Sequence, residues 1–161
     1  MSTSSSISAP FVPSHDDAGL IAQPIGYWAN AAGQAVVHNI RTALGALGLT
    51  QPAWWVLHHL SQRPKGWGRA ELTEFLSYYP GPGDDLPGDI DSLVARGLLS
   101  QDEDGHLLRT ESGAELYARA AARQLELRRQ VHEGIPGEEY ARALKVLQRM
   151  IHNVKGDAWH H

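Results

Sequence analysis

The sequence contains no cysteine among its 161 residues. This absence excludes disulfide bonds, thiolate metal ligands and cysteine nucleophiles, and it fits a reducing cytoplasm. No apolar run approaches the roughly 20 residues that cross a bilayer, and the N-terminus lacks the basic region and long apolar stretch of a signal peptide. The sequence therefore predicts a cytoplasmic protein without a membrane segment.

Motifs of the common enzyme classes are also missing. The chain has no Gly-rich phosphate loop, no Gly-x-Ser-x-Gly turn and no recognisable Ser-His-Asp order. Nine histidines are present, but no two have the His-x-x-x-His spacing that places two metal ligands on one helix face. We therefore expect no metal and no cofactor, and a non-enzymatic function is favoured.

The charged residues are unevenly distributed. The formal net charge is −4, which argues against general binding of nucleic acid. Residues 84–104 contain seven acidic residues and a single arginine, Arg96. The acidity of the chain is thus concentrated in one segment, and the remainder is slightly basic.

Apolar residues recur at three- and four-residue spacing along most of the chain, which predicts helices. Thr50 and Thr110 are in place to cap two of them, and Asp104-Gly105 favours the tight turn of a hairpin. Pro87-Gly88 is expected to weaken the fourth helix near its start. The predicted helices span residues 24–47, 51–62, 69–76, 89–97, 110–135 and 136–156, and the hairpin spans residues 98–110.

This order predicts a mainly α fold, a winged helix-turn-helix of the form α-α-α-α-β-hairpin-α-α. Residues 1–22 are rich in Ser and Pro and are expected to form a disordered arm. Residues 156–161 end in His160-His161 and are expected to form a flexible tail.

Four stretches resemble the multiple antibiotic resistance regulator (MarR) family: "LGLTQPAWWVLHHL", "AELTEFL", "LVARGLL" and "LLRTESGAEL". They occur in the family's order, and the resemblance covers about residues 25–154. It implies a MarR-like domain at residues 23–155, with a winged-helix lobe at 50–110 and dimerisation helices at 24–48 and 111–155. It further implies an obligate homodimer that binds double-stranded DNA through paired recognition helices and is regulated by a small aromatic ligand.

The sequence also supports a dimer on its own terms. The first and last helices carry more apolar surface than a chain of this length covers alone, and helices with exposed apolar stripes need a partner. We therefore expect both to be part of a homodimer interface.

The resemblance places DNA contacts in the fourth helix, in the hairpin and at the start of the third helix. The segment "DDLPGDID" departs from the family, whose recognition helices typically begin with a Ser/Thr-rich turn, and the hairpin tip "QDEDGH" is acidic as well. Carboxylates facing DNA phosphates oppose binding, whereas Arg63 and Lys65 lie where a phosphate contact is reasonable. The candidate DNA-binding residues are Arg69, Asp89, Asp91, Ser92, Arg96, His106 and Arg109.

Three functions therefore stay open. The first is a ligand-responsive regulator of transcription that binds DNA. The second is a winged-helix scaffold that has lost DNA binding and acts as an aromatic small-molecule binder or a cofactor-independent enzyme, in which a histidine performs acid–base chemistry. The third uses the acidic face to dock a basic protein.

The stretch "WWVLHH" predicts an aromatic ligand site. Its Trp and His residues are four apart in pairs, so each pair shares a helix face. Aromatic residues and a histidine of the first helix are expected to complete the pocket. The alternative for Trp54 is core packing. The candidate ligand-binding residues are Tyr27, Trp28, His38, Trp54, Trp55, His58 and His59.

Overall fold

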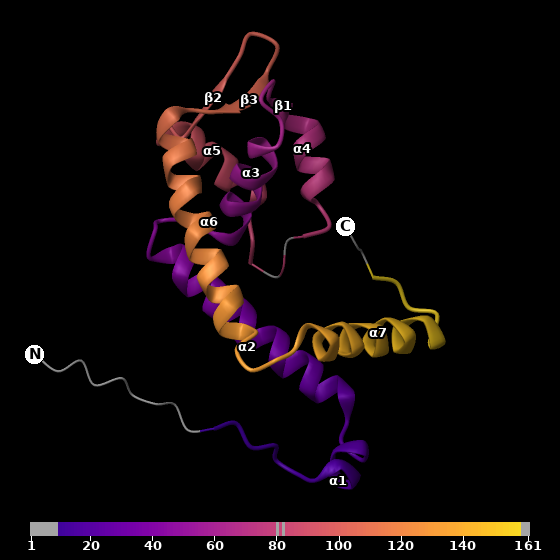
Figure 1. Cartoon of the computed structure of the whole chain (residues 1–161). Coiled ribbons are helices and arrows are strands. Elements are labelled where there is room, and N and C mark those ends of the chain that lie inside the picture. The colour runs from indigo at the N-terminus through magenta and orange to yellow at the C-terminus, as the bar shows by residue number, and fades with distance from the viewer. Residues whose placement is uncertain (1–9, 80, 82, 159–161) are drawn as a thin grey trace, which may run out of the picture. The chain divides into compact units, whose positions relative to one another are not determined.

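The computed structural model is mainly helical, with a small antiparallel sheet (Figure 1). It describes residues 10–79, 81 and 83–158. No helix within these residues is long and apolar enough to cross a membrane. The elements are α1 (Asp17–Ile21), α2 (Ile25–Gly45), α3 (Gln51–Ser61), β1 (Trp67–Gly68), α4 (Arg69–Leu76), α5 (Leu86–Ala95), β2 (Leu99–Gln101), β3 (His106–Arg109), α6 (Glu111–Val131) and α7 (Gly137–Asn153).

The chain divides into two units, residues 1–35 and 36–161, and the boundary falls within α2. The first unit contains α1, whose N-cap Asp16 accepts a hydrogen bond from the backbone N–H of Gly19 over 2.8 Å. This helix lies in the arm that was expected to be disordered, so that part of the arm has regular structure. Residues 1–9 of the arm lie outside the described residues, as do residues 159–161 of the predicted tail.

Two of the helices in the second unit begin at the predicted caps. The hydroxyl of Thr50 accepts a hydrogen bond from the N–H of Ala53 over 3.1 Å, and Pro52 occupies the first turn of α3. Thr110 caps α6 in the same way, accepting from the N–H of Gly113 over 3.1 Å. A threonine side chain at this position satisfies a backbone donor that has no partner within the helix.

The sheet has three strands in the order β1-β3-β2. The β2–β3 hairpin turns at Gly105, which has a φ of 81°, a conformation that glycine adopts without steric cost. The third strand, β1, lies between the second and third predicted helices, where no strand was expected. It consists of Trp67 and Gly68, which pair with Leu107 and His106 of β3.

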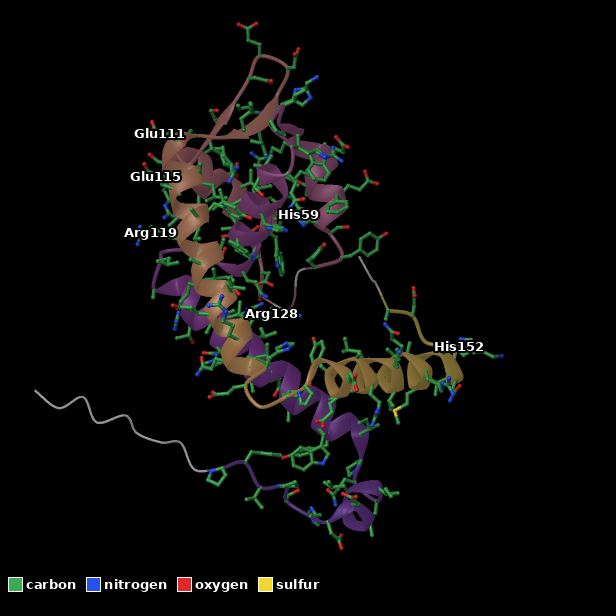
Figure 2. The ribbon with its side chains drawn as sticks, in the orientation of Figure 1. His59, Glu111, Glu115, Arg119, Arg128 and His152 are labelled. Carbon is green, nitrogen blue, oxygen red and sulfur yellow. The ribbon has the colours of Figure 1, made fainter. Side chains whose placement is uncertain are left out.

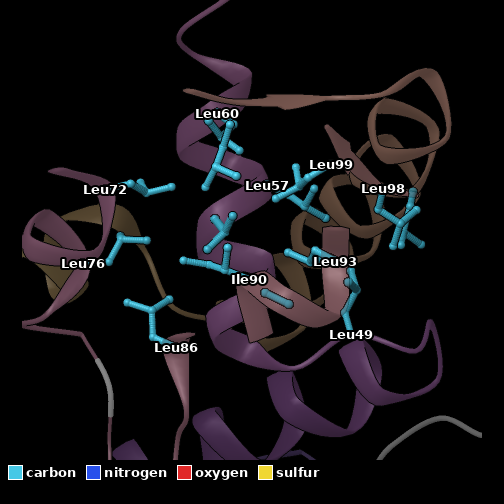
Figure 3. Packing of buried hydrophobic residues seen from close by; sticks show 14 of the residues in the cluster. Leu49, Leu57, Leu60, Leu72, Leu76, Leu86, Ile90, Leu93, Leu98 and Leu99 are labelled. Atoms are coloured by element: carbon cyan, nitrogen blue, oxygen red, sulfur yellow. The ribbon is translucent and has the colours of Figure 1, made fainter. Parts of the chain in front are cut away.

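A single cluster of apolar side chains forms the core of the lobe (Figure 3). The fully buried side chains come from α2 to α6 and from β3. Phe75 on α4 is 37% exposed. The largest fully buried residues are Leu44, Leu57, Leu72, Leu76, Ile90, Leu93, Leu107, Val56 and Pro52.

Helix α5 begins three residues earlier than predicted and includes Pro87 and Gly88. Pro87 lies in the first turn, where a proline costs nothing because its missing N–H would have had no helical partner. Asp85 caps this turn by accepting a hydrogen bond from the N–H of Gly88 over 3.1 Å. The expectation that Pro87-Gly88 weakens the helix is therefore wrong: the pair lies in a capped first turn.

Candidate functional site

Helix α5 occupies the position of a recognition helix and has two distinct faces. Its apolar face is buried in the core through Leu86, Ile90 and Leu93. The opposite face is exposed and contains few groups able to bind a nucleic acid. The exposed residues of this helix and its C-cap are Pro87, Asp91, Ser92, Ala95 and Arg96.

Two aspartates before α5 have structural roles. Asp84 is only 7% exposed at its side chain, and its carboxylate lies 2.9 Å from the guanidinium of Arg41 on α2. The same carboxylate accepts a hydrogen bond from the N–H of Gly81 over 2.8 Å. Asp85 is the N-cap of α5. The Asp84 carboxylate is therefore buried against Arg41, whereas Asp85 remains exposed at the N-cap.

Asp89 is held against the start of α3. Its carboxylate accepts a hydrogen bond from the hydroxyl of Thr50 over 2.7 Å. Burial raises the pKa of the Asp89 carboxyl above its usual value, the hydrogen bond from Thr50 opposes this rise, and the charges of Asp85 and Asp84 add to it. Asp89 is thus partly buried between α3 and α5, with one carboxylate oxygen bonded to Thr50.

Arg69 and Asp91, both candidate DNA-binding residues, form an ion pair. Arg69 is the first residue of α4, and its guanidinium lies 2.7 Å from the carboxylate of Asp91. It also donates a hydrogen bond to the backbone carbonyl of Pro87 over 3.3 Å. The pair joins α4 to the exposed face of α5, so the charge of Asp91 is compensated within the protein.

The other two α5 candidates differ in their contacts. Arg96, the C-cap of α5, donates a hydrogen bond to the carbonyl of Gly48 over 2.8 Å, which ties the end of the helix to the α2–α3 turn. Ser92 is exposed on the face away from the core. Its hydroxyl can donate or accept a hydrogen bond to a phosphate or a base edge.

At the hairpin tip, the backbone uses one of the acidic side chains. The carboxylate of Asp102 accepts hydrogen bonds from the N–H of His106 over 2.7 Å and of Asp104 over 3.0 Å. The first of these bonds is the main reason that the pKa of Asp102 is lowered. The side chains of Asp102, Asp104 and His106 could hold a metal ion, since their ligand atoms lie within 4.8 Å of one another. The hydrogen bonds that form the turn explain the position of Asp102 without a metal ion.

Three further cations lie outside α5, on β3 and in the turn before α4. Arg109 on β3 lies over the ring of Tyr117, with 4.9 Å to the centroid. Arg63 lies over the ring of Trp67 at 3.6 Å, and Lys65 is exposed in the same turn before α4. These residues provide positive charge beside α5 that the helix itself lacks.

The aromatic residues of α3 divide between two sides of the helix. On the α6 side, Trp54 is stacked on Tyr117, with 5.3 Å between ring centroids and 12° between planes. A ring nitrogen of His58, Nδ1, lies 3.2 Å from the Tyr117 hydroxyl. Trp54 also packs against the core, as the alternative to a ligand contact predicted.

On the α4 side, a second group of rings surrounds His59. Figure 2 shows His59 on α3, and its ring lies 5.0 Å from that of Phe75 on α4. Trp55 contacts Tyr79 at 5.2 Å, and Trp67 contacts Phe75 at 5.1 Å. The two α3 histidines and tryptophans therefore form contacts within the lobe on opposite sides of α3.

The remaining aromatic candidates are Tyr27, Trp28 and His38. Tyr27 and Trp28 lie in the first unit, where their rings meet edge to face at 5.2 Å. His38 is exposed on α2. The rings of His58 and His59 lie 5.2 Å apart and join the two groups on α3. The ligand-binding role of these residues stays a prediction.

A hollow of about 340 Å³ lies between α2, α6 and α7, and sequence reasoning missed it. Apolar side chains form most of its lining, and polar side chains from α2 and α6 complete it. Among these, the side-chain nitrogen of Gln124 is buried without a hydrogen-bond partner. Figure 2 shows Arg128 on α6. The lining residues are Val36, Asn39, Ile40, Gln124, Leu127, Arg128, Val131, His132 and Tyr140.

Comparison with known proteins gives matches in structure. No protein-family model matches the sequence, and no curated protein matches it. A MarR family protein of Mycobacterium tuberculosis, solved in complex with DNA, is 25% identical, with a TM-score of 0.62 over 80% of this chain and 98% of that one. The transcriptional regulator PA3341 is 28% identical, with a TM-score of 0.61 over 82% and 98%.

A third similar structure has a bound small molecule. CouR from Rhodococcus jostii RHA1, bound to p-coumaroyl-CoA, is 24% identical, with a TM-score of 0.62 over 81% of this chain and 93% of that one. The expected order of helices and hairpin is confirmed by all three. The chain has the winged helix-turn-helix fold of the MarR family of transcriptional regulators.

Proposed function

We propose that this protein is a ligand-responsive regulator of transcription that binds double-stranded DNA as a homodimer in the cytoplasm. The observation that carries the proposal is the engagement of the recognition-segment carboxylates by other groups of the lobe. Asp84 is paired with Arg41, Asp89 with Thr50 and Asp91 with Arg69. The charges of Asp84 and Asp91 are therefore compensated by arginines of the lobe, which weakens the electrostatic objection to DNA binding, while Asp85 and the hairpin-tip residues Asp102, Glu103 and Asp104 stay exposed. The DNA complex of the similar M. tuberculosis protein supports the same function.

The proposed DNA contacts divide into two kinds. Ser92, on the exposed face of α5, is the candidate for a contact in the major groove. Lys65, Arg69 and Arg109 supply positive charge for phosphates, and the His106 ring offers a hydrogen-bond donor on the hairpin. To bind a DNA phosphate, Arg69 must give up its ion pair with Asp91. We therefore expect moderate affinity for DNA and a measurable dependence of that affinity on salt.

The exposed apolar surface of the terminal helices supports the homodimer. Helix α7 has no buried residue over its 17 residues, although its apolar side chains recur at helical spacing and form one face of the helix. Leu144, Val146 and Met150 are 41%, 45% and 41% exposed. In α2, Ala43 and Leu44 alone are buried. Amphipathic helices with so little burial require a partner, and a second copy of the chain offers the same helices.

For the effector, we propose the hollow between α2, α6 and α7. Its apolar lining suits the body of a small organic molecule, and Arg128 provides a cation for an acidic group. Trp54, Trp55, His58 and His59 then act by packing α3 against its neighbours. CouR binds p-coumaroyl-CoA, and its likeness to this chain at 24% identity concerns the fold.

The test is retention of fragmented genomic DNA from the source organism by the purified full-length protein, between about 20 and about 200 mM salt. We expect specific fragments to be retained at low salt and released steeply as salt rises. The matched variants are Lys65→Ala, expected to weaken binding to all sequences and to reduce the salt slope by about 1, and Ser92→Ala, expected to weaken binding to the retained fragments selectively. Absence of retention at the lowest salt would refute the proposal and favour a small-molecule binder or enzyme.

A further inference from the structure

Polar contacts join the proposed recognition helix to the α2–α3 junction at three points, in addition to the contacts of Arg69 with Asp91 and Pro87. Arg41 lies 2.9 Å from Asp84, two residues before α5 begins. Thr50 donates to Asp89 in the middle of the helix, and Arg96 at its end donates to Gly48. The three partners on the other side all lie between residues 41 and 50, at the junction of α2 and α3.

Arg41 occupies the central place in this arrangement. Its Nη2 contacts Asp84, and its Nε donates a hydrogen bond to the side-chain oxygen of Gln51, the first residue of α3, over 3.0 Å. One guanidinium thus connects α2, the start of α3 and the α4–α5 connector. The fixed fork of an arginine is suited to such a double contact.

Within the described part of the connector, the N–H of Asp84 donates to the carbonyl of Gly81 over 3.2 Å, and the Asp84 carboxylate accepts from the N–H of Gly81. Gly83 has a φ of 86°, so this turn requires glycine there. The Asp84 side chain is largely buried beside Arg41, and removing either partner would leave the other charge poorly compensated.

We infer that Arg41 is a positioning residue: through Asp84 it sets the position of α5 relative to α2 and so controls specific DNA recognition. This inference rests on the proposed function. Because α2 is also part of the proposed dimer interface, a movement of α2 would reach the recognition helix through this contact. Breaking it is expected to weaken specific binding about tenfold, within the usual range of coupling between sites.

The test compares Arg41→Ala, Arg41→Lys, Asp84→Asn and the double variant Arg41→Ala/Asp84→Asn. For each variant, the affinity for a retained genomic fragment and for a random duplex of equal length is measured. We expect about tenfold weaker binding of the specific fragment by both Ala and Asn variants, partial recovery with Lys, and no further loss in the double variant. Binding of the random duplex should change by less than about twofold, because the phosphate contacts remain.

The Asp84→Asn variant separates positioning from charge. It removes a negative charge, so electrostatics alone would strengthen DNA binding, whereas loss of positioning weakens it. Specific binding by Asp84→Asn that equals or exceeds that of the parent would overturn the inference, as would additive losses in the double variant. Arg123→Ala, which breaks the exposed pair with Glu126 on α6, is the matched control and should leave binding unchanged.

Amide hydrogen exchange tests the positioning role of Arg41 without DNA. In Arg41→Ala and Asp84→Asn we expect faster exchange of the amides of residues 84–86 and 88–90, and unchanged exchange in α6. Unchanged exchange in residues 84–86 and 88–90 would overturn the positioning role even if DNA is bound. If the parent retains no DNA, the proposed function fails by itself, while faster exchange would still support a contact that positions α5.

Discussion

The guanidinium of Arg69, at the start of α4, lies 2.7 Å from the carboxylate of Asp91 on the exposed face of α5. Both side chains are open to solvent in part, so the net contribution of the pair to stability is small. Its larger effect is on the charge of the surface, because Asp91, the acidic group on the exposed face of α5, compensates the charge of Arg69. The pair therefore moderates any affinity of this face for a polyanion.

Asp91→Asn is expected to strengthen DNA binding. The substitution removes one negative charge from the face of α5 and frees Arg69 for a phosphate. We expect affinity to rise about three- to tenfold at low salt and the salt slope to become steeper by about 1. Fluorescence anisotropy with a retained duplex at several salt concentrations measures both quantities. Affinity that falls would show that Asp91 itself contacts a base, as an acceptor from cytosine can.

The substitution Asp89→Asn is expected to stabilise the folded protein more as pH rises. Burial raises the pKa of Asp89 in the folded protein, so between its usual and its raised pKa the folded state binds a proton more tightly than the unfolded state. Stability therefore falls as pH rises through this window, and the cost is fully present above it. An asparagine avoids that cost and still accepts from Thr50. The difference in free energy of unfolding between variant and parent, from urea denaturation at about pH 3.5 and about pH 7, should favour the variant more at pH 7.

The order of elements was predictable because its signals are local. Apolar spacing, the caps Thr50 and Thr110 and the Asp104-Gly105 turn each act over a few residues, and all three are present in the structure. Strand β1 was missed because two residues carry no strand pattern of their own. It exists through pairing with β3, about 40 residues later.

The role of the acidic segment was not predictable from local charge. Arg41 is 43 residues from Asp84, and Thr50 is 39 residues from Asp89. A count of charges within residues 84–104 cannot include partners at that distance, so it overstated the acidity presented to DNA. The hollow between α2, α6 and α7 escaped notice for the same reason, since it depends on how three helices lie together.

Leu144→Glu is expected to dissociate the proposed dimer. The side chain is 41% exposed on a helix without buried residues, and burying a carboxylate in an apolar interface is unfavourable. We expect the dimer dissociation constant to rise at least about tenfold. Sedimentation velocity over a range of protein concentrations measures it. Asn153→Glu, which adds the same charge at an exposed polar position on the opposite face of α7, is the control. Equal effects of the two variants would point to charge repulsion and not to loss of apolar contact.

Gly113→Ala is expected to destabilise the lobe. Gly113 is buried in the first turn of α6, where the backbone carbonyl of Leu98 occupies the place of a β-carbon. An added methyl group must displace α6 from the end of the α5–β2 turn, at a cost of about 1–3 kcal/mol in the free energy of unfolding. Urea denaturation at equal protomer concentration measures this cost. Gly45→Ala, at the end of α2 with nothing within 4 Å of the new methyl group, should be neutral or stabilising by up to about 1 kcal/mol. A Gly113→Ala variant as stable as Gly45→Ala would contradict the close approach of α6 to Leu98.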